Sequence, residues 1–295
     1  MRNITFVTAA WVTVSCAAAQ SAPEWWKYLP ENSTSVVGIR WQTAQSTLFA
    51  PALRAELAHL GFPDLDILRR TEQLLIAGPT HLIIAFGTFP NDKLPDQLIA
   101  AGFTTTSIGS VDGFASPKIT IAHLSDQLLL IGTLAAIEEA LAPHRFSLLA
   151  SRGARYSQED LWVVASRLPD PLASLFIPLD TEATAFEGSV SVWEGLHVVA
   201  AIGQASSIKA AQLTGVLERA LDDRPALAEG TEITVRNRSV LVRIDLDERQ
   251  LKASTSLAPV PSQRSFQDGV NKATPNAAIR ILGLSGGPRE IPLRR

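Results

Sequence analysis

Hydrophobic residues in the middle of the chain change their spacing in a way that predicts two strands and then a helix. Apolar side chains alternate with other residues over 190–192 and 196–202, and Glu194-Gly195 between them suits a tight turn. From 207 to 221 the apolar positions instead recur about every 3.6 residues. We therefore expect a hairpin followed by a helix in this part of the chain.

The same succession of spacings occurs earlier. Residues 119–121 and 128–131 have the pattern of two strands, and 134–141 carries a helical stripe. Both copies end the second strand on an Ile-Gly step, at Ile131-Gly132 and at Ile202-Gly203. We expect a duplicated α+β unit, in which glycine at each junction supplies either a positive φ or close packing.

The rest of the pattern adds further strands and helices. Strands are predicted at 36–41, 81–87, 104–106, 161–166, 233–235, 240–246 and 278–284, and helices at 53–60, 64–77 and 92–98. The chain is therefore predicted to be an α+β protein with two related sheet-plus-helix units, built mostly from antiparallel hairpins with packing helices. Near its start, Trp25, Trp26 and Tyr28 are expected to plug the end of the core rather than to form a binding platform.

Changes in composition divide the chain into six segments. They are a signal peptide at 1–19, a first unit at 20–150, a polar linker at 151–160, a second unit at 161–256, a flexible linker at 257–277 and a C-terminal strand and tail at 278–295. The strand of the tail is short and apolar on one side. We expect it to pair with an edge of its own sheet, or otherwise with a partner protein.

The first residues have the features of an export signal. Arg2 provides a positive start, 4–14 is a short apolar core, and Ala17-Ala18-Ala19 fits a cleavage site. We expect an exported protein, periplasmic or extracellular. Lipid attachment at Cys16 is the alternative, and it is disfavoured because Thr13 stands where a lipoprotein signal has an aliphatic residue. Cleavage after the alanines removes the one cysteine and excludes disulfides.

Composition narrows the possible partners. Hydrophobic residues make up 46% of the chain and charged residues 19%, which is typical of a packed globule. The formal net charge is −3 and no basic run occurs, so nothing favours nucleic acid as a partner. No later segment has the apolar length of a membrane span, so no transmembrane helix is expected in the mature chain.

Two short motifs invite a catalytic interpretation. Gly283-Leu284-Ser285-Gly286-Gly287-Pro288 resembles the nucleophile segment of trypsin-like proteases, but Leu284 replaces an acidic residue and too little chain follows. The Ser206–Lys209 segment has the Ser-x-x-Lys spacing of penicillin-binding enzymes without their other motifs. We interpret the first as a glycine turn and expect Ser206 or Ser207 to cap a helix.

The sequence gives little support for a metal site or for acid–base catalysis. None of the five histidines has the spacing of a metal site. His123 and His197 fall in corresponding hairpins, which permits a paired site but favours hydrogen-bonded structural residues. The acidic residues Asp245, Asp247 and Glu248 lack the glycine and distal glutamate of a calcium loop. We therefore predict no catalytic, cofactor-binding or metal-binding residues, and no cofactor.

Three short segments resemble a loose group of uncharacterised exported bacterial proteins with two tandem α+β units. They are Leu29-Pro30-Glu31-Asn32-Ser33 before the first strand, Leu130-Ile131-Gly132 and Ala201-Ile202-Gly203 at the junctions. The resemblance covers residues 29–256. It implies the fold and export, and no activity, cofactor or catalytic residue.

The function predicted from these observations is that of an exported, non-enzymatic envelope or secreted protein that binds another macromolecule. The partner, expected to be a protein, would bind at a sheet face or edge or at the C-terminal tail. An extracytoplasmic carrier of an apolar small molecule is the first alternative, and a hydrolase with an unrecognised site is the second. Neither the partner, the oligomeric state nor the biological process follows from the sequence.

Overall fold

The computed structural model describes residues 22–47, 50–59, 62, 67–166, 183–192, 195–222 and 225–250, and the backbone of 278–283 and 286–292. The predicted signal peptide with Cys16 and the predicted linker at 257–277 lie outside the described residues. The division into domains therefore stays a prediction.

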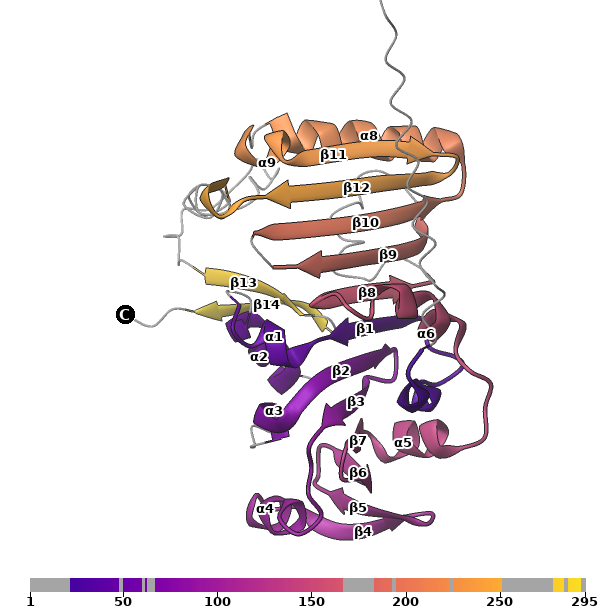
Figure 1. Ribbon diagram of the computed structural model, residues 1–295, viewed down its shortest axis with the longest axis vertical. Coiled ribbons are helices and arrows are strands. Elements are labelled where there is room, and N and C mark those ends of the chain that lie inside the picture. The colour runs from indigo at the N-terminus through magenta and orange to yellow at the C-terminus, as the bar shows by residue number, and fades with distance from the viewer. Residues whose placement is uncertain are drawn as a thin grey trace, which may run out of the picture.

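One antiparallel sheet of twelve strands forms the body of the molecule (Figure 1). Its order is β11-β12-β10-β9-β8-β1-β2-β3-β7-β6-β5-β4. The strands are β1 Ser35–Ile39, β2 Thr71–Gly78, β3 Leu82–Gly87, β4 Thr104–Ile108, β5 Val111–Ala115, β6 Thr120–Ser125, β7 Leu128–Gly132, β8 Leu161–Ala165, β9 Ala183–Ser191, β10 Leu196–Gln204, β11 Thr231–Arg236 and β12 Ser239–Leu246. The predicted α+β class is confirmed, and strands of both predicted units belong to this sheet.

The helices are short and lie against the sheet. They are η1 Glu24–Tyr28, α1 Trp41–Ala44, α2 Ala50–His59, α3 Ile67–Arg70, α4 Leu94–Ala100, α5 Leu134–Leu141, α6 Leu148–Gly153, η2 Ala154–Tyr156, α8 Ser207–Asp222 and α9 Pro225–Glu229. None of the helices in the described part of the chain combines the length and the hydropathy needed to cross a membrane.

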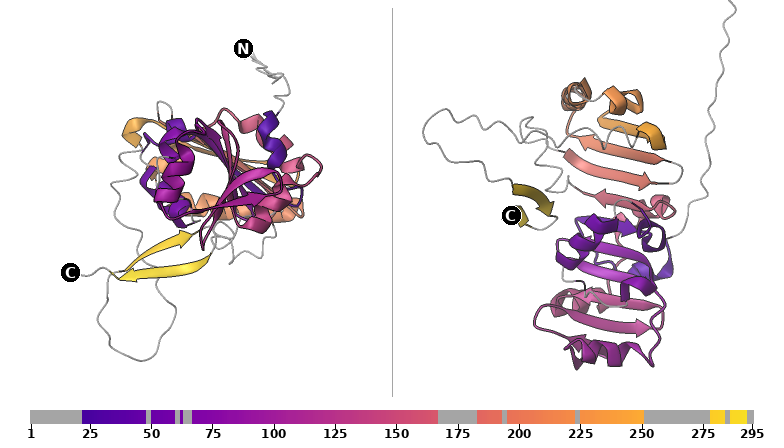
Figure 2. Two further views of the ribbon diagram at one scale, coloured as in Figure 1. Left: turned by 90° about the horizontal axis from the view of Figure 1, so that it is seen from below. Right: turned by 90° about the vertical axis from the view of Figure 1, so that its left-hand side faces the viewer.

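The half of the sheet from β1 to β7 is covered on both faces (Figure 2, left). On one face, which we call face A, Leu130 of β7 packs with Ile137 of α5 and Leu149 of α6. On the other, face B, Ile131 packs with Leu57 of α2 and Leu98 of α4. Because successive strand residues point to opposite faces, the central strands β3 and β7 of this half are apolar at every position.

The half from β9 to β12 has a helix on one face only. Ile202 and Val240 pack with Ala210 and Leu213 of α8. Strand register places these residues on face B, because Ile202 pairs with Phe186, which in turn pairs with Ala165 of β8. On face A the described helices reach only β9, where Arg152 of α6 and Tyr156 of η2 donate hydrogen bonds to Glu187; none of them packs over β10–β12.

The two hairpin-helix units differ in the face that their helices cover. Helix α5 lies on face A and α8 on face B, so the internal repeat is not confirmed. Neither Gly132 nor Gly203 has a positive φ, so that explanation of the junction glycines is wrong. A Cβ on Gly203 would come within 3.2 Å of the Ala185 Cβ, whereas one on Gly132 would make only ordinary contacts.

The helix predicted at 64–77 is wrong over most of its length. Of its described residues, only 67–70 are helical, and 71–77 belong to strand β2. Strand β2 lies between β1 and β3, with Leu75 on face A and Leu74 on face B. A strand buried on both faces has a continuous apolar run, which periodicity cannot distinguish from a buried helix.

Two smaller expectations near the far edge of the sheet also differ from the structure. The segment around Gly109–Gly113, which has no strand in the predicted pattern, turns into β5 at Val111. The helix α4 begins after Lys93 and has no side-chain cap, although the pattern placed its start at residue 92. Both differences are local and leave the topology unchanged.

The N-terminal aromatic residues plug one end of the core, as predicted. Trp26 is buried on face A and its ring lies 5.2 Å from that of Trp162. Trp25 stacks on Phe86 with ring centroids 5.4 Å apart. A Cβ on either Gly38 or Gly153 would overlap the Trp162 ring, so these two glycines make the space that the indole fills.

The predicted tail strand forms, but with a different partner. Strand β13 (Ala278–Gly283) pairs with β14 (Gly286–Pro292) in a separate two-stranded sheet. The expectation that it joins an edge of the large sheet is therefore wrong. The pattern missed β14 because Pro288 and charged residues interrupt its apolar positions.

Candidate functional site

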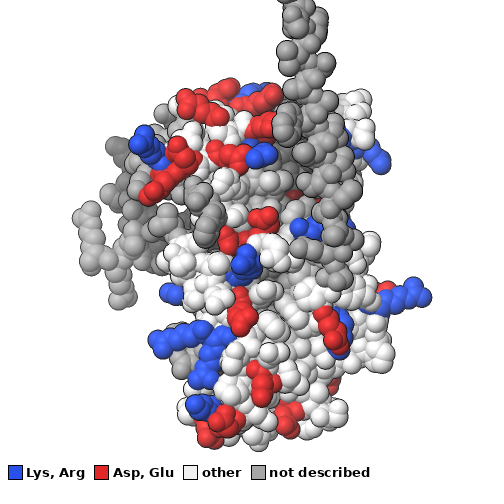
Figure 3. Space-filling model, viewed as in Figure 1, with Lys and Arg blue, Asp and Glu red and all other residues white. Residues whose placement is uncertain are grey.

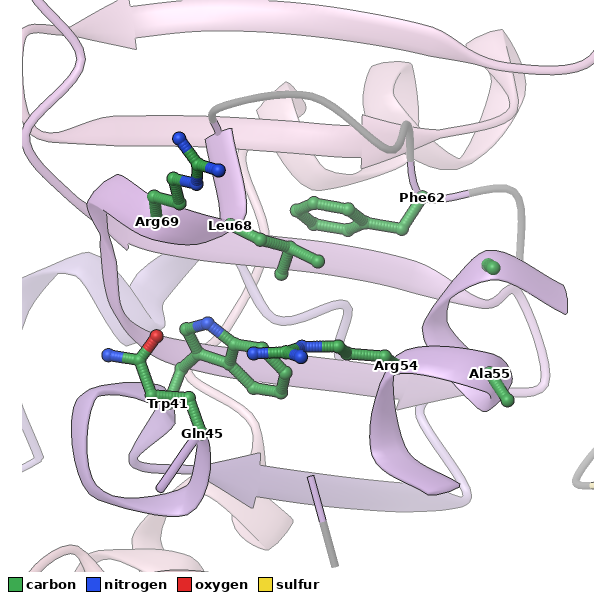
Figure 4. A pocket seen from close by; sticks show the side chains of 8 residues that line it. Trp41, Gln45, Arg54, Ala55, Phe62, Leu68 and Arg69 are labelled. Atoms are coloured by element: carbon green, nitrogen blue, oxygen red, sulfur yellow. The ribbon is translucent and has the colours of Figure 1, made fainter. Parts of the chain in front are cut away.

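A cavity of about 460 Å³ opens on face B beside α1, α2 and α3 (Figure 4). Its volume is within the range of pockets that hold small molecules. The lining residues come from three short helices and the segment after α2: Trp41, Gln45, Arg54, Ala55, Ala58, Phe62, Leu68 and Arg69. The helices pack on the covered half of the sheet, so the walls rest on a rigid support.

Local sequence explains how these side chains converge. Helix α1 starts directly after β1 and turns Trp41 onto face B, where the indole is 1% exposed. Along α2, Arg54 and Ala58 are four residues apart and share one side of the helix, while Leu57 points into the core. Phe62 packs back onto the same cluster.

The charges of the lining are of one sign. It contains Arg54 and Arg69 and no carboxylate. The Arg54 guanidinium lies over the Trp41 ring, with Cζ 5.9 Å from the ring centroid (Figure 4). Within the part of the chain that the structure describes, Arg54 forms no ion pair with a carboxylate. Figure 3 shows basic side chains gathered over α2 and α3.

The indole of Trp41 also carries a donor without an acceptor. Its Nε1–H is buried and has no hydrogen-bond partner among the described residues. Figure 4 shows this nitrogen on the edge of the ring that faces α3. An unpaired buried donor costs about 1–3 kcal/mol, so it requires a structural or functional explanation.

The residues weighed from the sequence do not assemble into one site. His123 Nε2 lies 3.1 Å from the Phe89 carbonyl oxygen, whereas His197 Nδ1 lies 2.8 Å from Asp245 Oδ1. The two histidines lie on β6 and β10, so they form no pair. Ser206 accepts a hydrogen bond from the Lys209 amide at 3.2 Å, which confirms its role as a helix cap.

His197 instead belongs to a polar row on face A. It stands opposite Ser191 on β9 and Asp245 on β12. Asp245 also accepts a 2.6 Å bond from Arg243 Nε, and the hydrogen bonds from His197 and Arg243 lower the pKa of Asp245. Ser191 donates to Asp160 at 3.4 Å, so the serine is not directed at the imidazole as a hydrolytic triad requires.

A second polar cluster joins the two halves of the sheet. Glu187 of β9 accepts hydrogen bonds from Arg152 Nε at 2.7 Å, from Arg155, and from the Tyr156 hydroxyl at 3.1 Å. Burial and the negative charge of Glu187 raise the pKa of Tyr156 to about 12. The segment predicted as the 151–160 linker is thus helical up to Tyr156 and attached to β9.

Metal binding gains no support from the geometry. In the described ranges, no three histidine, cysteine or acidic side chains lie close enough to hold a metal ion. The segment with the protease-like glycines connects β13 to β14, where Gly283 pairs with Gly286, and Ser285 lies outside the described residues.

Sequence reasoning did not find the cavity. Trp41 and Arg54 are only 13 positions apart along the chain, but nothing in the pattern placed α1, α2 and α3 around one space. The signals available were a tryptophan directly after a buried strand and two arginines at residues 69 and 70. Both features occur in many proteins without a pocket.

Comparison with known proteins supports the fold alone. No protein-family model and no curated protein matches the sequence. The chain is similar to the solved structure of TP0453 in crystal form I, with a TM-score of 0.58 and 9% identity over 80% of this chain and 97% of that chain. For crystal form III of TP0453 the TM-score is 0.52 and the identity 8%, over 78% of this chain and 96% of the other.

Proposed function

We propose that the protein is exported and acts as a non-enzymatic module that binds another protein through face A of β9–β12. We call this surface the open face. Export rests on the predicted signal at 1–19. The observation that carries the binding role is the lack of a covering helix over β10–β12 among the described residues, combined with an exposed apolar side chain at Val199.

The centre of the open face is apolar. Val199 of β10 is 46% exposed. Beside it Ala201 pairs with Leu241 of β12, and both side chains are half-buried. On most antiparallel sheets the uncovered face is polar, so an apolar centre here favours contact with a partner.

Charged residues of both signs stand directly beside these apolar residues. Arg243 is the cross-strand partner of Val199 and of Glu232, and the His197–Asp245 pair continues the row. A surface that combines apolar residues with charges of both signs suits a protein–protein interface. It does not favour nucleic acid or an anionic membrane, which attract surfaces of uniform positive charge.

Site-specific photocrosslinking in the exporting cell tests the proposal. A benzophenone amino acid at Val199 is expected to form an adduct with a second, different protein. The matched control places the same group at Ile208, which is 70% exposed on α8 at the opposite face. The adduct at 199 should disappear when a second substitution, Leu241→Glu, puts charge beside it.

Three outcomes would count against the proposal. They are no adduct at position 199, equal adducts at 199 and 208, or an adduct containing only two copies of this chain. In the last case the open face would be a contact between copies rather than a binding site for another protein.

A further inference from the structure

We propose that the cavity beside α1, α2 and α3 binds a small organic anion with an aromatic or aliphatic body. The inference is independent of the open face, since the cavity lies on face B in the other half of the sheet. The chemistry of the cavity wall indicates the kind of ligand. One part of the wall carries hydrogen-bond donors and positive charge, and the other part carries apolar side chains.

Two hydrogen-bond donors at the cavity have no acceptor among the described residues. The Trp41 Nε1–H is buried and unpaired. Arg54 presents a guanidinium whose described contact is the face of the Trp41 ring. Stacking uses the face of the guanidinium and leaves its N–H groups at the edge free to donate. A carboxylate or sulfonate in the cavity would satisfy both residues.

The charge of the lining decides against a neutral or cationic ligand. Two arginines line the cavity and no carboxylate does. Filling it with a neutral apolar molecule would remove water from Arg54 without providing a partner, which is unfavourable. A cation would meet like charge. An anion gains charge-assisted hydrogen bonds, which are the stronger kind.

The remaining wall accounts for the apolar body of the ligand. Phe62 and Leu68 form one side of the cavity in Figure 4, and Ala55 and Ala58 leave space beside them on α2. A phosphate or sulfate ion alone would leave this apolar wall in contact with water. An anionic group attached to a ring or short chain uses both parts.

Two fluorescent probes that differ in one group test the proposal. The first is 8-anilinonaphthalene-1-sulfonate, an aromatic anion, and the second is N-phenyl-1-naphthylamine, its neutral counterpart without the sulfonate. The full-length protein is titrated with each. We expect saturable binding of the sulfonate at one site, and binding of the neutral probe at least about tenfold weaker, as loss of a charge-assisted bond implies.

Variants locate the site. Arg54→Gln is expected to weaken sulfonate binding by about tenfold and to strengthen binding of the neutral probe, which no longer removes water from a charged group. Trp41→Phe keeps a ring but removes the N–H, and should weaken sulfonate binding by about threefold. Arg219→Gln, at an exposed arginine on α8, is the matched control and should have no effect.

Two results would contradict the proposal. If Arg54→Gln and Arg219→Gln bind the sulfonate as the unmodified chain does, the anion does not occupy this cavity. If the neutral probe binds as tightly as the sulfonate, the cavity takes apolar molecules and the anion proposal fails. Thermal melting verifies that each variant is folded. Arg54 lies on the exposed side of α2, so its substitution keeps the test valid even if Trp41→Phe unfolds.

Discussion

The two halves of the sheet are built from the same kind of strands but are covered differently. Strand β7, with helices on both faces, is buried at all of its positions from 128 to 132. Strand β10, with α8 on one face, is fully buried only at Ile202 and Gln204. The uncovered face is marked in the sequence by the polar residues His197, Arg243 and Asp245, although Val199 and Ala201 on the same face are apolar.

Because of this difference, the two halves of the sheet would contribute to function in different ways. In the covered half the sheet is a support, and the candidate ligand site lies outside it, among α1, α2 and α3. In the other half the sheet itself provides the surface, because the helix protects only face B. If the comparison is right, equivalent substitutions in the two halves should have unequal consequences for stability.

The largest contrast is expected between Leu130→Ala and Val199→Ala, two truncations on face A. Leu130 is fully buried in the covered half, so its truncation should lower the free energy of unfolding by about 3 kcal/mol. Val199 is 46% exposed, so its truncation should change that free energy by less than about 0.5 kcal/mol. Urea denaturation measures both. Similar losses at the two positions would show that the open face is packed.

Glycine-to-alanine substitutions sharpen the same contrast. At Gly38 a Cβ would lie 2.0 Å from a ring carbon of Trp162, so Gly38→Ala should destabilise the fold by about 2–3 kcal/mol through overpacking. At Gly215 in α8 a Cβ would meet nothing within 4 Å, and Gly215→Ala should stabilise by about 0.5–1 kcal/mol. Opposite shifts of the melting temperature are expected; a Gly38→Ala variant that melts no lower than the unmodified chain would contradict the packing described around Trp162.

An effect expected only at high pH concerns the junction between the halves. The pKa of Tyr156 is raised from 10.0 to about 12 by burial and by Glu187. Folding therefore favours the neutral phenol. The resulting stability is complete below pH 10 and is lost as the pH rises from 10 towards 12. In Tyr156→Phe, the free energy of unfolding should fall less steeply over this interval.

Absorbance titration checks the pKa directly. The chain has two tyrosines, Tyr28 and Tyr156, so the variant Tyr28→Phe reports Tyr156 alone. Its midpoint should lie near 12 in the folded protein, and Glu187→Gln should lower it by removing the neighbouring negative charge. A midpoint at the ordinary tyrosine value would mean that η2 does not hold the phenol against β9.

Much of the fold could be predicted from the sequence, because most hairpins can be recognised from the local spacing of apolar residues and from the turn residues between them. The turns near Ser125 and Asn237 and the changes of period at Gly132 and Gly203 all correspond to element boundaries. Three strands are exceptions: β5 and β14 had no predicted strand, and β2 was expected to be helical. Burial of both its faces removes the alternation on which strand prediction depends.

What could not be predicted is set by how the helices pack on the sheet and against one another. The apolar stripes of α5 and α8 do not predict which face of the sheet each helix covers, because either stripe could pack on either face. In the structure α5 covers face A and α8 covers face B. The cavity likewise depends on how α1, α2 and α3 pack against one another. Trp41 and Arg54 meet only after β1 and β2 have brought their helices together.

The central position of β1 has a consequence for the order in which the chain can assemble. Strand β1 pairs with β2 on one side and with β8 on the other, yet strands β2–β7 are all made before β8. During synthesis in the N-to-C direction, the edge of β1 that faces β8 must wait with its hydrogen-bonding groups open. An edge in that state is prone to join another chain. The pairing of residues 161–165 with β1 is therefore the step that covers the open edge of the first half. It also provides the strand edge with which β9 pairs.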